Sequence, residues 1–256
     1  MIHRKVQLPK DKQTRIILVS DLHIGLTGYR EDVFDDILAD IAKPNTLWIG
    51  IGDFVEGREP SHKFYNPDEV TMTVGAQYEY FFDKIRPYLK KCIGLQPGNH
   101  EDSLIMKSTI NPLLQFCNDN EVPYLGATGY TTLTNGDKEV VMVTNHGAGG
   151  GGKVGGSINK GVDYAKTFSG DIVALGHYHK LAVTIDEEKY TSEVDGIKIQ
   201  RWKPKTIILN GSALEAYQDG SYGGYVEKKM LTPNSLGYAI ITIEKDMEYW
   251  VRLKAY

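Results

Sequence analysis

The chain has 256 residues, of which 41% are hydrophobic and 24% are charged, and its formal net charge is −4. These proportions are ordinary for a globular protein and allow one large α/β domain or two small ones. The negative charge argues against tight non-specific binding of nucleic acid by the whole surface, although it leaves room for a local basic groove.

The cysteine usage and the N-terminal residues are those of a cytoplasmic protein. Cys92 and Cys117 show no close ligand spacing, and we expect both to be reduced. Residues 1–15 are polar and lack the apolar core of a signal peptide, and no later run approaches the length of a membrane span. We therefore expect a cytoplasmic protein without membrane contact. No convincing linker interrupts the chain, so we expect one domain over residues 1–256.

The first predicted elements form a β-α-β unit. Apolar runs predict buried strands over residues 16–19 and 46–51, and apolar residues at helical spacing predict a helix over residues 29–44. Because parallel strands end at one edge of their sheet, polar side chains that follow them are expected to meet there. The polar side chains concerned are Asp21 and His23 after the first strand, and Asp53 and Glu56 after the second. Alternation along an extended chain would also place Asp21 and His23, which are two residues apart, on the same face.

The next part of the chain predicts a helix and a third strand. Residues 66–69 combine a capping asparagine, a proline and two acids, which indicates the start of a helix that continues to Leu89. An apolar run then predicts a strand over residues 92–95. This strand leads to Asn99 and His100.

A broken helix and a hairpin follow. The helix is expected over residues 102–117, with an interruption near Pro112. The pair Asn135-Gly136 indicates a hairpin between strands over residues 130–134 and 138–143, and the second strand leads to His146.

Residues 147–161 contain eight glycines together with Lys153 and Lys160. One interpretation is a flexible surface loop. The other is a mobile loop over the site, whose backbone N–H groups and lysines bind a phosphate of the substrate. The segment lacks the P-loop pattern, so it does not indicate nucleoside triphosphate binding of that type.

The last predicted elements are strands. An apolar strand over residues 171–175 precedes His177 and His179, which would face the same way on an extended segment. The remainder of the chain, residues 181–256, is expected to form a strand meander. Its strands are predicted over residues 206–209, 238–243 and 247–253.

Five predicted strand ends therefore carry carboxylates, imidazoles or an amide. A lone histidine is more often structural than a ligand, but five such ends in succession are hard to explain by packing. Burying these groups together without a metal would be costly, whereas two divalent cations would neutralise the carboxylates and bind the imidazoles. The groups are Asp21 and His23, Asp53, Asn99 and His100, His146, and His177 and His179.

The order of these motifs over residues 21–179 resembles that of the calcineurin-like metallophosphoesterases. The motifs are Asp-x-His, Gly-Asp, Gly-Asn-His-Glu, a lone His and Gly-His-x-His. The resemblance implies an α/β fold, namely a four-layer α/β/β/α sandwich of two mixed β-sheets flanked by helices. It implies that Asp53 bridges two divalent cations, and that His100 assists the leaving group without binding metal. Glu56 would be the acid that orients His100. The further ligands implied are Asp21, His23 and His179 for one cation, and Asn99, His146 and His177 for the other.

The implied activity is hydrolysis of a phosphoester by in-line attack of a metal-bound hydroxide, while two cations hold the phosphoryl oxygens. Nitrogen and oxygen ligands without a thiolate suit Mn²⁺, Fe or Zn²⁺, and we expect Mn²⁺. The expected partner is the phosphoester substrate, with DNA or a nucleotide as the candidates.

Short motifs bear on the class of phosphoester. The pattern Ser-Asp-x-His-x-Gly at residues 20–25 and Pro60-Ser61 resemble the Mre11/SbcD-like branch of DNA-repair nucleases, although the chain is short for their DNA-capping domain. The arginine that directly follows the acid in protein phosphatases is missing after Glu56. We therefore predict a phosphodiesterase for nucleic acid or a nucleotide. The alternatives are a phosphomonoesterase for a phosphoprotein or small metabolite, and a non-catalytic scaffold, against which the complete ligand set argues.

Overall fold

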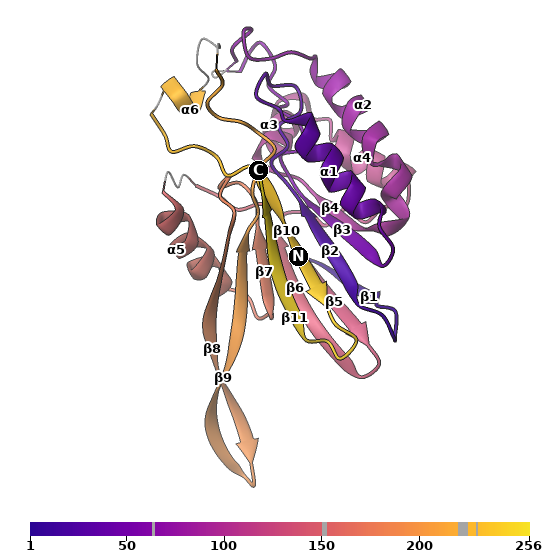
Figure 1. Cartoon of the computed structure of the whole chain (residues 1–256), viewed down its shortest axis with the longest axis vertical. Helices are drawn as coiled ribbons and strands as arrows, with labels where there is room; N and C mark the ends of the chain where they lie inside the picture. The colour runs from indigo at the N-terminus through magenta and orange to yellow at the C-terminus, as the bar shows by residue number, and fades with distance from the viewer. Residues whose placement is uncertain (63–64, 150–152, 220–224, 229) are drawn as a thin grey trace.

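The computed structural model describes residues 1–62, 65–149, 153–219, 225–228 and 230–256. Over these residues, two β-sheets pack face to face and helices cover their outer faces (Figure 1). The expected four-layer α/β/β/α sandwich is therefore confirmed. No helix in the described part of the chain is both long and apolar enough to cross a membrane.

One sheet has five strands among the described residues, and its central strands are parallel. Its order is β11 (Tyr249–Ala255), β10 (Gly237–Ile243), β2 (Thr14–Val19), β3 (Thr46–Ile51) and β4 (Cys92–Gln96). Helices from the first half of the chain supply apolar side chains to the core on its outer face. They are α1 (Glu31–Ala42), α2 (Val74–Ile85), α3 (Asn99–Ser108) and α4 (Pro112–Asp119).

The other sheet has six strands in the described part of the chain, with mixed directions. Its order is β1 (Ile2–Gln7), β5 (Thr128–Asn135), β6 (Lys138–Asn145), β7 (Ile172–Leu175), β9 (Ile197–Leu209) and β8 (Ala182–Val194). Helix α5 (Val154–Ala165) covers its outer face (Figure 1). The short helix α6 (Tyr225–Lys228) lies in the segment between β9 and β10.

The central strands are continuously apolar because both of their faces are buried. In β2, Ile16 and Leu18 lie in the core between the two sheets, whereas Ile17 and Val19 lie in the core beneath the helices. Because both faces are buried, the polar side chains of β2, β3 and β7 occur only at the ends of the strands. The carboxyl ends of these three strands carry the candidate ligands.

Two local predictions in the first half were wrong. Residues 66–69 form a turn rather than a helix start, because Asn66 accepts the Asp68 N–H through its side chain and Val70 enters a β-bridge with Leu26. Helix α2 begins after Thr73, whose hydroxyl accepts the Ala76 N–H. It ends at Ile85, and a 3₁₀ helix (Arg86–Lys91) with an early proline carries Leu89.

The glycine-rich segment was also predicted wrongly, since residues 154–165 form α5 instead of a loop. Ile158, Val162 and Ala165 recur at helical spacing and pack in the core on β7 and β9. Gly161 allows this contact, because a Cβ there would lie 3.1 Å from a methyl carbon of Ile207. The prediction for residues 150–152 falls outside the described residues.

Strand β1 was not predicted from the sequence, whereas β8 and β9 fall within the predicted strand meander, which placed a strand only over residues 206–209 of this hairpin. Strand β1 is mostly exposed and joins the sheet only through its parallel pairing with β5, so its apolar pattern is weak. Strands β8 and β9 form a hairpin of 13 residues on each side, which projects beyond the rest of the sandwich (Figure 1).

Candidate metal centre

Five of the seven candidate ligands have a left-handed backbone conformation and do not lie on extended segments. The angle φ is 53° at Asp21 and at His23, 52° at Asp53, 68° at His177 and 49° at His179. The expectation that alternation along an extended chain aligns these side chains was therefore wrong about the backbone. A left-handed non-glycine residue costs about 1–2 kcal/mol, so such a conformation persists only where surrounding interactions impose it.

Backbone hydrogen bonds between the loops after β2 and β3 impose these turns. The N–H of Asp21 donates to the carbonyl of Gly52 at 3.0 Å, and the N–H of His23 donates to the carbonyl of Asp53 at 3.1 Å. The carboxylate of Asp21 in turn accepts the N–H of His177, at 2.9 Å from Oδ1 and 3.1 Å from Oδ2. The three loops are thus locked to one another around the ligand side chains.

Glu101 anchors the loop that carries Asp53. Its buried carboxylate accepts the N–H groups of Asp53 at 2.8 Å, Gly98 at 2.7 Å and Phe54 at 2.9 Å. Burial and the neighbouring Asp53 carboxylate raise the pKa of Glu101 to about 7. Glu101 was not among the site residues predicted from the sequence. Its signal was a glutamate three residues after the helix N-cap, which is the capping-box position.

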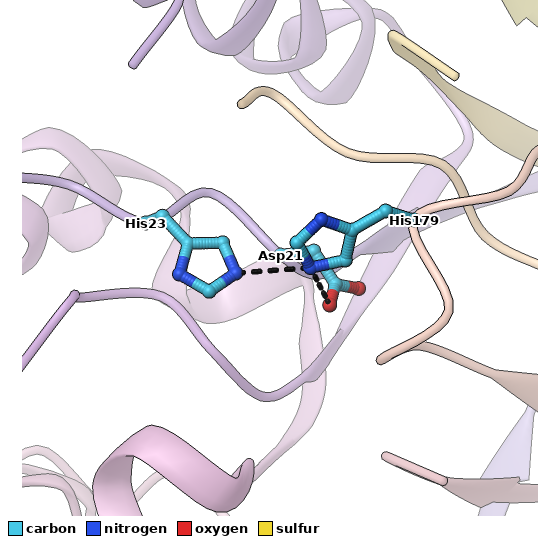
Figure 2. A group of neighbouring side chains, drawn as sticks. All are labelled: Asp21, His23 and His179. Atoms are coloured by element: carbon cyan, nitrogen blue, oxygen red, sulfur yellow. Dashed lines mark hydrogen bonds and ion pairs between the residues drawn. The ribbon is translucent and has the colours of Figure 1, made fainter. Parts of the chain in front are cut away.

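One group of possible ligands consists of Asp21, His23 and His179 (Figure 2). The Nε2 atoms of His23 and His179 lie 3.1 Å apart, and Nε2 of His179 lies 3.2 Å from Oδ1 of Asp21. Nδ1 of His23 donates to the Glu56 carboxylate at 3.0 Å, which leaves the lone pair of Nε2 directed toward His179. Nitrogen lone pairs and a carboxylate that converge in this way suit a cation.

A second group consists of Asp53, His146 and His177, with Asn99 beside it. His146 donates through Nδ1 to the Ile51 carbonyl at 2.7 Å, so its Nε2 faces Oδ2 of Asp53 at 3.1 Å. Nε2 of His177 lies 3.1 Å from the carbonyl oxygen of Gly149, and its Nδ1 lies 2.7 Å from Oδ1 of Asn99. When Nε2 carries the proton, Nδ1 of His177 and Oδ1 of Asn99 are both acceptors and face each other at 2.7 Å. A cation bound between them would remove this repulsion.

Asp53 belongs to the second group and also forms a third group with His23 and His100, so it links the two ligand groups. Its Oδ1 accepts the N–H of His100 at 2.9 Å, while Oδ2 lies 3.1 Å from Nε2 of His146 and 3.8 Å from Nε2 of His23. Burial opposes ionisation of Asp53, but the histidines around it hold its pKa well below the ordinary value. Burial likewise lowers the pKa of His146, yet Asp53 and Asp21 raise it to about 10. The site therefore favours positive charge, and its locked imidazoles and carboxylates fit divalent metal ions.

His100 and Glu56 differ from the expected arrangement in one contact. Nδ1 of His100 donates to the main-chain carbonyl of Glu56 at 2.6 Å, and its Nε2 lies 4.0 Å from Oδ2 of Asp53. The Glu56 carboxylate instead binds His23 at 3.0 Å and Arg58 at 2.5 Å, and it lies 3.6 Å from His100. Glu56 thus orients His100 mainly through its backbone and His23 through its side chain.

A cavity of about 780 Å³ opens over both groups. Its lining includes His23, Asp53, Asn99, His100, His177 and His179. Lys153 is exposed just before α5, and Lys160 lies within α5 with its Nζ beside Gly149. Gly149 lines the cavity, but neither lysine is among its lining residues in the described structure. Their role in substrate binding stays a prediction.

Two buried polar residues near the site were missed. Ser212 donates through its hydroxyl to the Asp21 carbonyl at 2.9 Å. Asn210 donates to the hydroxyl of Ser20 at 3.0 Å and accepts the Ala239 N–H at 2.9 Å. Both follow the apolar end of β9, so the same rule of polar residues after a buried strand would have found them.

Comparisons with known proteins found one family and several similar structures. The family model of the calcineurin-like phosphoesterases matches residues 14–181, a range that contains every candidate ligand. Among solved structures, wild-type Vps29 from Entamoeba histolytica complexed with Zn²⁺ is 14% identical, with a TM-score of 0.46 over 94% of this chain and 99% of that one. A predicted phosphoesterase from Streptococcus pneumoniae is 11% identical, with a TM-score of 0.37 over 96% and 99%. A search of curated proteins gives no match. On the family match, the chain belongs to the calcineurin-like phosphoesterases.

Proposed function

We propose that this protein is a dinuclear metal-dependent phosphodiesterase that acts on nucleic acid or a nucleotide. The observation that carries the proposal is that Asp53 shares one cavity with two groups of ligand atoms, belonging to one group and lying 3.8 Å from His23 of the other. In each group the ligand atoms lie within 4.8 Å of one another. A shared carboxylate between two clusters of imidazole and carboxylate groups is the arrangement of a two-metal site.

The proposed ligands follow the two groups. Asp21, His23, Asp53 and His179 would hold one divalent cation, and Asp53, Asn99, His146 and His177 would hold the other. When bound, the pair would activate water and offset the charge of the phosphoryl oxygens. We propose Mn²⁺ as the metal, and Fe or Zn²⁺ would suit the same nitrogen and oxygen donors.

His100 would protonate the leaving oxygen. Its Nδ1 is fixed by the Glu56 carbonyl, so the proton on Nε2 is the one available to the substrate. Burial would lower the pKa of His100, but the carboxylates of Asp53 and Glu56 raise it above the ordinary value. A cationic imidazole near neutral pH is the form that a general acid requires.

The charge of the cavity favours a diester over a monoester. Apart from histidines, Arg58 and Lys180 are the cations among its described lining residues. Arg58 pairs with Glu56, and Lys180 donates to Thr232 and Pro233. A phosphodiester carries a single negative charge, so it needs fewer cations than the dianion of a monoester.

The test is the activity of the metal-stripped protein after reloading with Mn²⁺. We expect faster turnover of bis-p-nitrophenyl phosphate than of p-nitrophenyl phosphate, and cleavage of labelled single- or double-stranded DNA. Preference for the monoester would support a phosphomonoesterase instead. No turnover of any of these substrates by protein with bound metal would support the non-catalytic scaffold.

A further inference from the structure

One wall of the cavity comes from residues beyond the family match. Leu214, Gln218, Leu231 and Asn234 line it, although the match ends at residue 181. Leu26, from the loop after β2, also lines the cavity. The C-terminal segment therefore adds apolar and amide groups to a site whose floor consists of charged ligands.

This wall is attached directly to a candidate metal ligand. The N–H of Ser235 donates to the carbonyl of His179 at 2.8 Å. Lys180 is 4% exposed and donates through Nζ to the Thr232 hydroxyl at 3.0 Å and the Pro233 carbonyl at 2.5 Å. Because Lys180 follows His179 in sequence, the position of the wall is fixed relative to the metal centre.

The wall also packs tightly against the loop after β2. A Cβ on Gly28 would lie 2.4 Å from the Glu215 carbonyl oxygen, 2.6 Å from Nε2 of Gln218 and 3.1 Å from a methyl carbon of Leu214. Leu214 is bridged to Tyr29 in an antiparallel pair. The wall is thus a built surface that does not need to form around a ligand.

We propose that this wall binds the nucleoside portion of the substrate, an inference that rests on the proposed phosphodiesterase function. Leu214 and Leu231 offer apolar contact to the faces of a flat ring, and Gln218 offers an amide to its hydrogen-bonding edge. The carboxylates on this side, Glu69 and Glu215, disfavour a second phosphate there. A cavity of about 780 Å³ has the size of a site for a ligand as large as a nucleotide.

The test compares two ligands that differ only in the base. Adenosine 5′-monophosphate and ribose 5-phosphate are titrated into the Mn²⁺-loaded full chain by calorimetry. We expect the nucleotide to bind about ten-fold more tightly than the sugar phosphate, the effect of a few well-placed apolar contacts. Equal affinity for the two ligands would overturn the inference.

A pair of neighbouring variants locates the contact. Leu231 lines the cavity and is 39% exposed, whereas the adjacent Met230 is 89% exposed and does not line it. Leu231→Ser should weaken nucleotide binding about ten-fold and leave ribose 5-phosphate binding unchanged. Met230→Ser should bind both ligands like the unmodified protein. Equal effects of the two substitutions on nucleotide binding would contradict the proposed wall.

Turnover separates this inference from the function on which it rests. If the unmodified protein hydrolyses bis-p-nitrophenyl phosphate but binds both ligands equally, the phosphodiesterase proposal stands and the nucleoside wall is wrong. If it hydrolyses no phosphoester yet prefers the nucleotide, the wall stands as a binding site and the proposed catalytic function fails.

Discussion

The carboxylate of Glu101 accepts the backbone N–H of Asp53 at 2.8 Å, so the first turn of α3 holds the residue that links the two ligand groups. The same carboxylate accepts the N–H of Gly98 at 2.7 Å. One buried side chain therefore sets the distance between the loop after β3 and the loop after β4. Metal affinity should depend on this residue, although it is not itself a proposed ligand.

Glu101→Gln should weaken metal binding and lower stability. An amide cannot accept all of these hydrogen bonds, so we expect Mn²⁺ affinity to fall about 10–100-fold. The free energy of unfolding of the metal-free protein should fall by about 1–3 kcal/mol. Metal titration and urea denaturation measure the two effects. Glu139→Gln, on the exposed side of β6, serves as the control and should change neither quantity.

His100→Ala should lose turnover and keep its metal. General acid catalysis contributes about 10²–10⁴-fold, and kcat should fall by that factor. Although His100 groups with His23 and Asp53, the proposed ligand sets hold both cations without it, so metal content after gel filtration should match that of the unmodified protein. Loss of one equivalent of metal would show that His100 is a ligand and that the assigned roles are wrong.

Asp40 should contribute to stability at neutral pH and lose that contribution in acid. Its carboxylate is 3% exposed, accepts the Tyr238 hydroxyl at 2.6 Å and pairs with Lys43 and Lys254. Burial opposes ionisation, but these partners lower the pKa of Asp40 to about 2 from an ordinary value of 3.8. Because the folded state has the lower pKa, the stabilisation is complete above pH 4 and is lost as the pH falls through 2.

Asp40→Asn tests this expectation. The variant should be less stable at pH 7 by on the order of 1–2 kcal/mol, a figure reduced from the full linkage value because the lysines are partly solvated. The difference from the unmodified protein should shrink as the pH falls through 2 and vanish below that pH. Asp137→Asn in the exposed β5–β6 turn is the control. A difference that persists unchanged from pH 7 to pH 2 would assign the effect to packing and not to charge.

Lys153 and Lys160 should matter for a polymer and not for a small substrate. They lie outside the cavity lining, so a long polyanion can contact both lysines and the metal centre, whereas a small substrate inside the cavity does not need them. Replacing both with alanine should raise KM for DNA several-fold and flatten its dependence on salt, because fewer phosphates are neutralised. The kinetics of bis-p-nitrophenyl phosphate should not change.

A matched pair of lysines controls for net charge. Lys189 and Lys198 lie on the exposed β8–β9 hairpin, and their replacement with alanine removes the same charge. If that variant raises KM for DNA as much as the first, the effect comes from the overall field and the glycine-rich segment has no specific role.

The sequence by itself determined the strands of the parallel core and the chemistry at their ends. Runs such as residues 16–19 and 46–51 are apolar on both faces because helices cover one side and a second sheet covers the other. A polar residue directly after such a run is therefore placed at the sheet edge by local pattern alone. Asp21, Asp53 and His177 could be chosen in this way, since each follows a buried strand within a few residues.

Only the tertiary structure determined the backbone conformation of these residues and the ligand group to which each one belongs. His177 and His179 lie two residues apart, yet left-handed turns send the first to Asp53 and the second to Asp21. Those turns persist because N–H groups of one loop donate hydrogen bonds to carbonyl groups of another. The helix over residues 154–165 likewise forms because its apolar side packs on β7 and β9, despite its glycines. Contacts between residues far apart in the chain stabilise both the left-handed turns and this helix. The local sequence pattern does not indicate those contacts.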